Sequence, residues 1–86
     1  MKEARQVAVR GIIEASEWDE AGNPTRVIIL TRDEQEYGVE CDEVGASLFD
    51  HLTREVVVSG LMRAGRDGTR ILRPMSFAIM EANLAK

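Results

Sequence analysis

The chain has 86 residues, a net charge of −4, a hydrophobic content of 44% and a charged content of 30%. This length allows one domain with a small core, and the composition is that of a globular protein rather than a disordered one. We expect residues 1–86 to form a single domain, with flexible ends at 1–5 and 82–86. Because no apolar run reaches membrane-helix length and none follows the N-terminus as in a signal peptide, we predict a cytoplasmic protein without membrane contact.

Cysteine and histidine are too scarce for the usual catalytic and metal-binding combinations. Cys41 and His51 are the only residues of their types, so no intramolecular disulfide or multi-cysteine metal site is expected. A Cys41–His51 nucleophile pair is the one combination available, but Cys41 falls at an inward strand position, where a lone cysteine acts as a small hydrophobe. Carboxylates are concentrated in turns and on outward strand positions, as on a solvated face. We therefore predict no catalytic residues, metal or cofactor, and a protein that is not an enzyme.

Charge is distributed unevenly along the chain. Residues 1–53 hold five basic and twelve acidic side chains, whereas residues 54–73 hold five arginines and only two acidic residues. The net negative charge argues against a general polyanion binder. Arginine is nevertheless suited to bidentate contacts with phosphate or carboxylate, so any anion-binding surface is expected in the third quarter of the chain. The alternative is that these arginines pair with acidic residues on neighbouring strands.

The first half of the chain predicts three strands. Residues 7–18 alternate apolar and polar side chains with a period of two, which predicts a half-buried strand, and Gly11 predicts a bulge or sharp bend in its middle. Turn-forming residues follow, and residues 25–32 predict a second strand whose consecutive apolar residues indicate that both faces are partly covered. Residues 36–41 alternate again as a third strand.

The hydrophobic period then changes to that of a helix. Asp42 is a suitable N-cap, and residues 43–53 predict a helix of about three turns. Apolar residues recur on one face of this helix, namely Val44, Leu48, Phe49 and Leu52. Gly45 weakens the helix by up to ~1 kcal/mol relative to alanine, so packing must hold the helix in place.

The last part of the chain predicts a β-hairpin. Residues 55–63 form a β-branched run, and the Asp67-Gly68 dipeptide indicates a tight turn. Residues 69–73 open a fifth strand, which resumes at 75–80. Pro74 interrupts it and predicts a bulge or an edge position, because proline donates no ladder hydrogen bond.

Three strands, a helix and two further strands follow one another as in the OB-fold, a five-stranded Greek-key barrel. Segments 45–52 and 56–60, and Asp67-Gly68 with Ile71, resemble the helix, the fourth strand and the final hairpin of nucleic-acid-binding OB domains. An SH3-like or Sm-like barrel is the main alternative, and the helix before the fourth strand favours OB. We therefore expect a mainly β, five-stranded OB-fold barrel with one short helix between strands three and four.

This resemblance implies a ligand site. OB domains bind nucleic acid on the outer face of strands two and three, between the loop joining strands one and two and the loop joining strands four and five. Bases stack on aromatic rings there, and cations follow the backbone. The resemblance therefore implies a small module that binds single-stranded DNA or RNA weakly, through Trp18, Arg26, Arg32, Tyr37, Arg63, Arg66 and Arg70.

Several residues oppose this interpretation. Trp18 lies among acidic residues that repel phosphate, and its alternative role is to cover one end of the barrel. Tyr37 and Phe77 have an alternative role in the core.

The alternative function is a protein-interaction or homo-oligomeric structural module that binds no nucleic acid. In the second strand, Ile28 and Leu30 share one face while Val27 and Ile29 share the other, so one pair is exposed in a monomer. A homodimer or another protein partner would bury this surface. The candidate interface consists of Ile12, Ile28 and Leu30.

Overall fold

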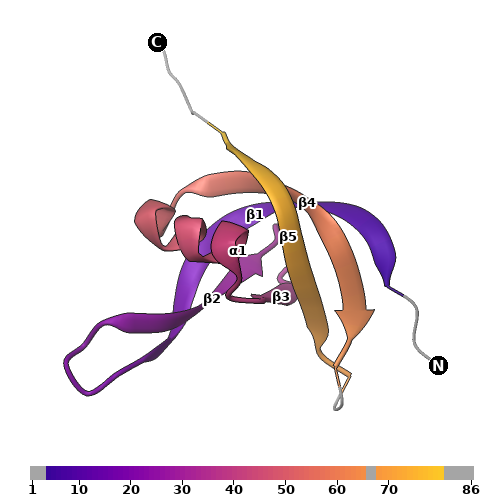
Figure 1. The fold of residues 1–86 in the computed structure, drawn as a ribbon. Helices are drawn as coiled ribbons and strands as arrows, with labels where there is room; N and C mark the ends of the chain where they lie inside the picture. Colours follow the sequence, from indigo (N-terminus) through magenta and orange to yellow (C-terminus); the bar gives the residue numbers. More distant parts are fainter. Residues whose placement is uncertain (1–3, 66–67, 81–86) are drawn as a thin grey trace, which may run out of the picture.

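The computed structural model describes residues 4–65 and 68–80, which form a mainly β structure with one short helical segment (Figure 1). The predicted order of three strands, a helix and two strands is confirmed. Of the predicted flexible ends, 1–3 and 82–86 lie outside the described residues. The elements in chain order are β1 (Arg5–Trp18), β2 (Pro24–Leu30), β3 (Glu36–Val39), α1 (Glu43–Ser47), the 3-10 helix η1 (Leu48–His51), β4 (Glu55–Ala64) and β5 (Arg70–Ile79).

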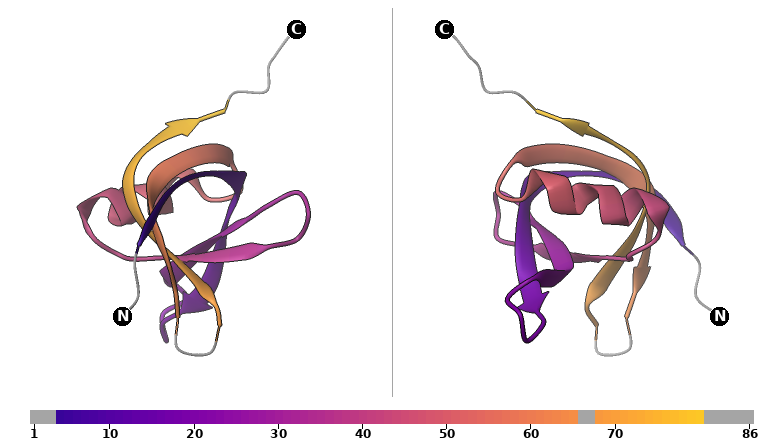
Figure 2. Two further views of the ribbon diagram at one scale, coloured as in Figure 1. Left: turned by 90° about the vertical axis from the view of Figure 1, so that its right-hand side faces the viewer. Right: turned by 60° about the vertical axis from the view of Figure 1, so that its left-hand side comes forward.

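The strands pair in a closed ring in the order β1–β2–β3–β5–β4. The β3–β5 pairing is parallel, and the other four pairings are antiparallel. Parallel neighbours need a long crossover connection, and here α1, η1 and β4 make up that connection. Figure 2 places the helical segment in the half of the molecule away from the β1–β2 turn. In the described part of the chain, no helix is both long enough and apolar enough to cross a membrane.

The core is built from alternate residues of the strands, as the period of two requires. Val27 and Ile29 of β2 face inward and are buried, whereas Ile28 and Leu30 face outward and are half-buried. The structure therefore shows which of the two pairs lies on the outer surface. The buried hydrophobic residues are Val9, Ile13, Val27, Ile29, Val39, Leu48, Val56, Val58 and Leu72.

Strand β1 is long enough to pair with two different neighbours. Its first part, from Arg5 to Ile12, pairs with β4, and its second part, from Ile12 to Trp18, pairs with β2. Gly11 lies at this change of partner, where an added Cβ would approach the Leu30 carbonyl oxygen to 2.5 Å. Glycine permits this close approach. The irregularities in register lie further along, between Ala15 and Trp18, rather than at Gly11.

The helical segment is shorter and more irregular than the predicted helix over 43–53. Asp42 caps it as predicted, since its Oδ1 accepts a hydrogen bond of 2.9 Å from the Gly45 N–H. Helix α1 ends at Ser47, however, and a 3-10 turn follows. The Thr53 N–H donates to the Ile13 carbonyl oxygen at 2.6 Å, so the chain must leave the helical path to return to the sheet. Leu48 is fully buried at the centre of this segment.

Two strands end two residues earlier than predicted. β2 stops at Leu30 because Thr31 opens a turn, in which the Thr31 N–H donates to the Gln35 carbonyl oxygen at 2.9 Å. β3 stops at Val39 because the chain turns into the helix at Asp42. The prediction that Cys41 is buried is therefore wrong: its position lies beyond the strand, and the side chain is exposed.

The bulge predicted at Pro74 is confirmed. Ser59 pairs with Ser76, but the next residue of β4, Gly60, pairs with Pro74, so Met75 is an extra residue in β5. The interruption therefore bends β5 without ending it, and the strand continues from Arg70 to Ile79.

The β1–β2 turn lies on the same side of the molecule as the ends of β4 and β5 that adjoin residues 66–67. The β1–β2 turn, and the ends of β4 and β5 that adjoin residues 66–67, lie at the lower edge of Figure 1 and of both views in Figure 2. In Figure 1, β2 and β3 lie between them.

Candidate ligand-binding face

A groove lies on the outer side of β2, β3 and β5, and it overlaps the face of strands two and three that the sequence resemblance indicated. Gly38 of β3 and Ile71 of β5 are register partners with outward-facing positions in this groove. Because Gly38 has no side chain, a ligand can approach the backbone there. The groove is lined by Thr25, Arg26, Gly38, Val39, Glu40, Cys41, Asp42, Arg63 and Ile71.

Two of the predicted binding arginines, Arg26 and Arg63, line this groove together. Each forms an ion pair: Arg26 Nε lies 3.8 Å from a Glu17 carboxylate oxygen, and Arg63 Nη2 contacts Glu40. The members of the first pair are 61% and 64% exposed, and exposed pairs contribute only about 0–1 kcal/mol to stability. The ion pair of Arg26 is therefore weak, whereas the Arg63–Glu40 pair is less exposed, at 49% and 30%.

Four of the eight described arginines pair with acidic residues. Arg10 Nε lies 2.8 Å from Glu55, and Arg73 Nε lies 4.0 Å from Asp42. Among the arginines of 54–73, Arg63 and Arg73 thus have acidic partners, but these partners, Glu40 and Asp42, lie between β3 and α1 rather than on a neighbouring strand. Arg5, Arg32, Arg54 and Arg70 form no ion pair within residues 4–65 and 68–80.

Tyr37 and Arg70 contact each other rather than the groove. Tyr37 is half-buried against the hydrophobic core, and the Arg70 guanidinium carbon lies 5.7 Å from the centre of its ring. The two residues are also register partners in the parallel β3–β5 pair. This arrangement supports the core role of Tyr37, and Phe77 likewise packs against the core.

Trp18 is at the surface, with 58% of its area exposed. It is the last residue of β1 and pairs with Pro24 of β2. The adjoining turn is held by Asp19, whose Oδ1 accepts hydrogen bonds of 2.9 Å from the N–H groups of Ala21 and Asn23. The Asn23 bond is the main cause of the lowered pKa of Asp19. The turn thus presents an exposed indole beside a stabilised carboxylate.

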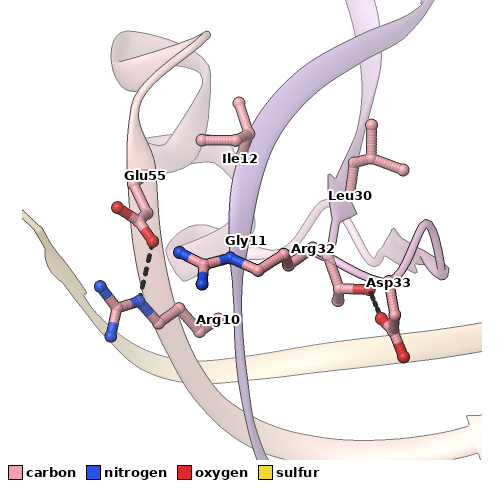
Figure 3. Close-up of a pocket in the computed structure, with 8 residues that line it drawn as sticks. Arg10, Gly11, Ile12, Leu30, Arg32, Asp33 and Glu55 are labelled. Atoms are coloured by element: carbon pink, nitrogen blue, oxygen red, sulfur yellow. Dashed lines mark hydrogen bonds and ion pairs between the residues drawn. The ribbon is translucent and has the colours of Figure 1, made fainter.

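Of the remaining predicted residues, Arg32 does not line this groove. Arg32 follows β2 and lines a second groove with Ile12 and Leu30 (Figure 3). Arg66 lies outside the described residues. The sequence analysis missed Thr25, Glu40 and Asp42 as groove residues. The sequence indicated only that arginines could pair with acidic residues on neighbouring strands. This expectation does not identify which acidic residue meets which arginine.

The described residues contain no arrangement for metal chemistry. Within 4–65 and 68–80, no three His, Cys, Asp or Glu side chains are grouped so that they could hold a metal ion. His51 packs edge-on against Phe77, with ring centres 5.8 Å apart, while Cys41 lines the groove. The Nδ1 atom of His51 is buried without a hydrogen-bond partner.

Comparisons of the chain with protein-family models, with curated proteins and with solved structures found no significant match in any of the three.

Proposed function

We propose that the chain is an OB-fold module that binds single-stranded nucleic acid weakly on the outer face of β2, β3 and β5. The fold assignment is supported by the closed five-stranded ring and by the helical segment that precedes the fourth strand. OB domains use this outer face for oligonucleotides.

The observation that carries the proposal is the groove in which Arg26 and Arg63 lie together. Arg26 is paired with the exposed carboxylate of Glu17, and such pairs are weak, so a phosphate can replace Glu17 at little cost. Arg63, which is paired with the half-buried Glu40, provides a second guanidinium in the groove. Trp18, at the adjoining turn, offers an exposed ring for base stacking. The acidic residues nearby keep the affinity low and sensitive to salt.

Fluorescence anisotropy with a labelled oligothymidylate tests this proposal. With two or three phosphate contacts, binding should weaken about 5–20-fold between about 50 mM and about 200 mM salt. The double variant Arg26→Ala/Arg63→Ala should abolish measurable binding, and Trp18→Ala should weaken it. The double variant Arg66→Ala/Arg70→Ala tests whether the connection between β4 and β5 contributes to oligothymidylate binding.

The matched control is Arg54→Ala, which removes an exposed arginine that has no ion pair in the described part of the chain. It should leave binding unchanged. Absence of binding at the lower salt concentration, or an equal loss in the control, would disprove the proposal.

A second candidate function is a homo-oligomeric or protein-interaction module. It is favoured by the half-buried, outward-facing Ile28 and Leu30, and by Ile12, which is the register partner of Leu30. Sedimentation equilibrium should then give a mass that rises with concentration above 9.6 kDa, and Leu30→Gln should restore the monomer. A monomer at every concentration, together with no partner in a pull-down, contradicts this function.

A further inference from the structure

The N-terminal half of β1 has one edge without a neighbouring strand among the described residues. Residues 5–12 pair with β4 on one side, and pairing with β2 on the other side begins only at Ile12. From 5 to 11, the backbone groups that point away from β4 therefore have no strand partner. Unpaired edges of this kind are templates for the addition of an extended segment.

A groove adjoins this edge at the point where β2 leaves β1. Gly11 and Ile12 of β1 lie on one side of it, and Leu30 lies on the other (Figure 3), while Thr31 and Arg32 also line it. Ile12 and Leu30 are register partners with outward-facing, half-buried side chains, so they provide an aliphatic surface. An added strand that followed the β1 edge would place an apolar side chain against this pair.

The cations around the edge indicate the charge of the segment that fits there. Figure 3 shows the Arg32 side chain extending across Gly11 towards Arg10. Arg10 Nε donates to Glu55 at 2.8 Å. Arg32, however, has no ion pair within the described ranges, and neither has Arg5 at the other end of the edge. The carboxylate in the groove that faces no arginine, Asp33, accepts a hydrogen bond from the Thr31 hydroxyl.

We propose that an extended acidic segment of a partner protein adds to the free edge of β1, pairing its carboxylates with Arg32 and Arg5 and packing an aliphatic side chain on Ile12 and Leu30. A second copy of this chain fits less well, because pairing β1 with β1 would bring Arg5 and Arg10 of both copies to one edge. The surface is separate from the groove of Arg26 and Arg63, so the proposal goes beyond nucleic-acid binding and does not depend on it.

The test is an NMR titration of the nitrogen-15-labelled chain with a peptide of about eight residues that alternates glutamate and leucine, the length of an ordinary strand. Amide shifts should change at 5–12 and 30–32, with half-saturation near ~1 mM. Hydrogen exchange should slow at the β1 amides that point away from β4. Arg32→Glu should weaken binding at least about fivefold, whereas Arg54→Glu, the matched reversal at another unpaired arginine, should change it less than about twofold.

The proposal is overturned if no amide shifts at ~5 mM peptide, or if the shifts centre on Gly38 and Ile71. It is also overturned if a lysine–leucine peptide binds equally well, or if oligothymidylate shifts the same β1 amides. Failure of oligonucleotide binding on the other face leaves the expected peptide result unchanged, so the two failures are distinguishable.

Discussion

Gly45, in the first turn of α1, lies so close to the Glu40 carbonyl oxygen that no Cβ fits between them. The start of the helix therefore rests directly on the chain that leaves β3. An isolated helix would be more stable with alanine at this position, by up to ~1 kcal/mol. In the folded protein the preference is reversed, because the obstructing atom belongs to the backbone and cannot rotate away.

We therefore expect Gly45→Ala to lower the free energy of unfolding by about 1–3 kcal/mol, as overpacking does. Urea denaturation followed by circular dichroism measures the change. Ala46→Ser, at the exposed neighbouring position, is the control and should change the stability by less than about 0.5 kcal/mol. If Gly45→Ala were stabilising, the close approach to Glu40 would be wrong.

The N-cap provides a second prediction. Asp42→Ala removes the acceptor of the Gly45 N–H and should cost about 0.5–2 kcal/mol of unfolding free energy. Asp42→Asn keeps an acceptor oxygen and loses only the exposed 4.0 Å contact with Arg73, so it should recover most of that loss. Equal destabilisation by the two variants would show that the charge, rather than the cap, matters.

The third prediction concerns Leu48, which is fully buried between the strands of the ring. Leu48→Ala should lower the free energy of unfolding by about 2–5 kcal/mol, because it removes apolar contact and leaves a cavity. Leu52→Ala, at a half-buried position of the same segment, should cost less. Thermal and urea unfolding of both variants measure the difference, and a larger loss for Leu52→Ala would contradict the packing described here.

The fourth prediction concerns acid. The pKa of Asp19 is lowered below its ordinary value of 3.8, first by the Asn23 N–H and then by the other donors in the turn. The pKa of Asp19 is lower in the folded chain than in the unfolded chain, so the ionised carboxylate stabilises the folded state above the unfolded pKa. This stabilisation is lost as the pH falls through the folded pKa. An NMR titration of the Asp19 carboxyl carbon should give a midpoint below 3.8. A midpoint at or above that value would mean that the turn does not hold the carboxylate in solution.

Local features of the sequence determined much of this architecture. The alternation in 7–18 and 55–63, the capping residue Asp42 and the interruption at Pro74 were interpreted correctly, because each depends on residues adjacent in the chain. The alternation in β2 likewise predicted that one apolar pair would face outward. Only the closed ring decided that this pair is Ile28 and Leu30.

The tertiary structure alone decided which distant residues meet. Arg63 reaches Glu40, and Arg70 covers Tyr37, because β5 pairs with β3 after the helical crossover and β4 pairs with β5. The turn of the chain into the helix at Asp42 ends β3 at Val39 and leaves Cys41 exposed in a groove. Periodicity reports which face of a strand is covered, but the partner of a charged side chain depends on strand order and register, which are set when the ring closes.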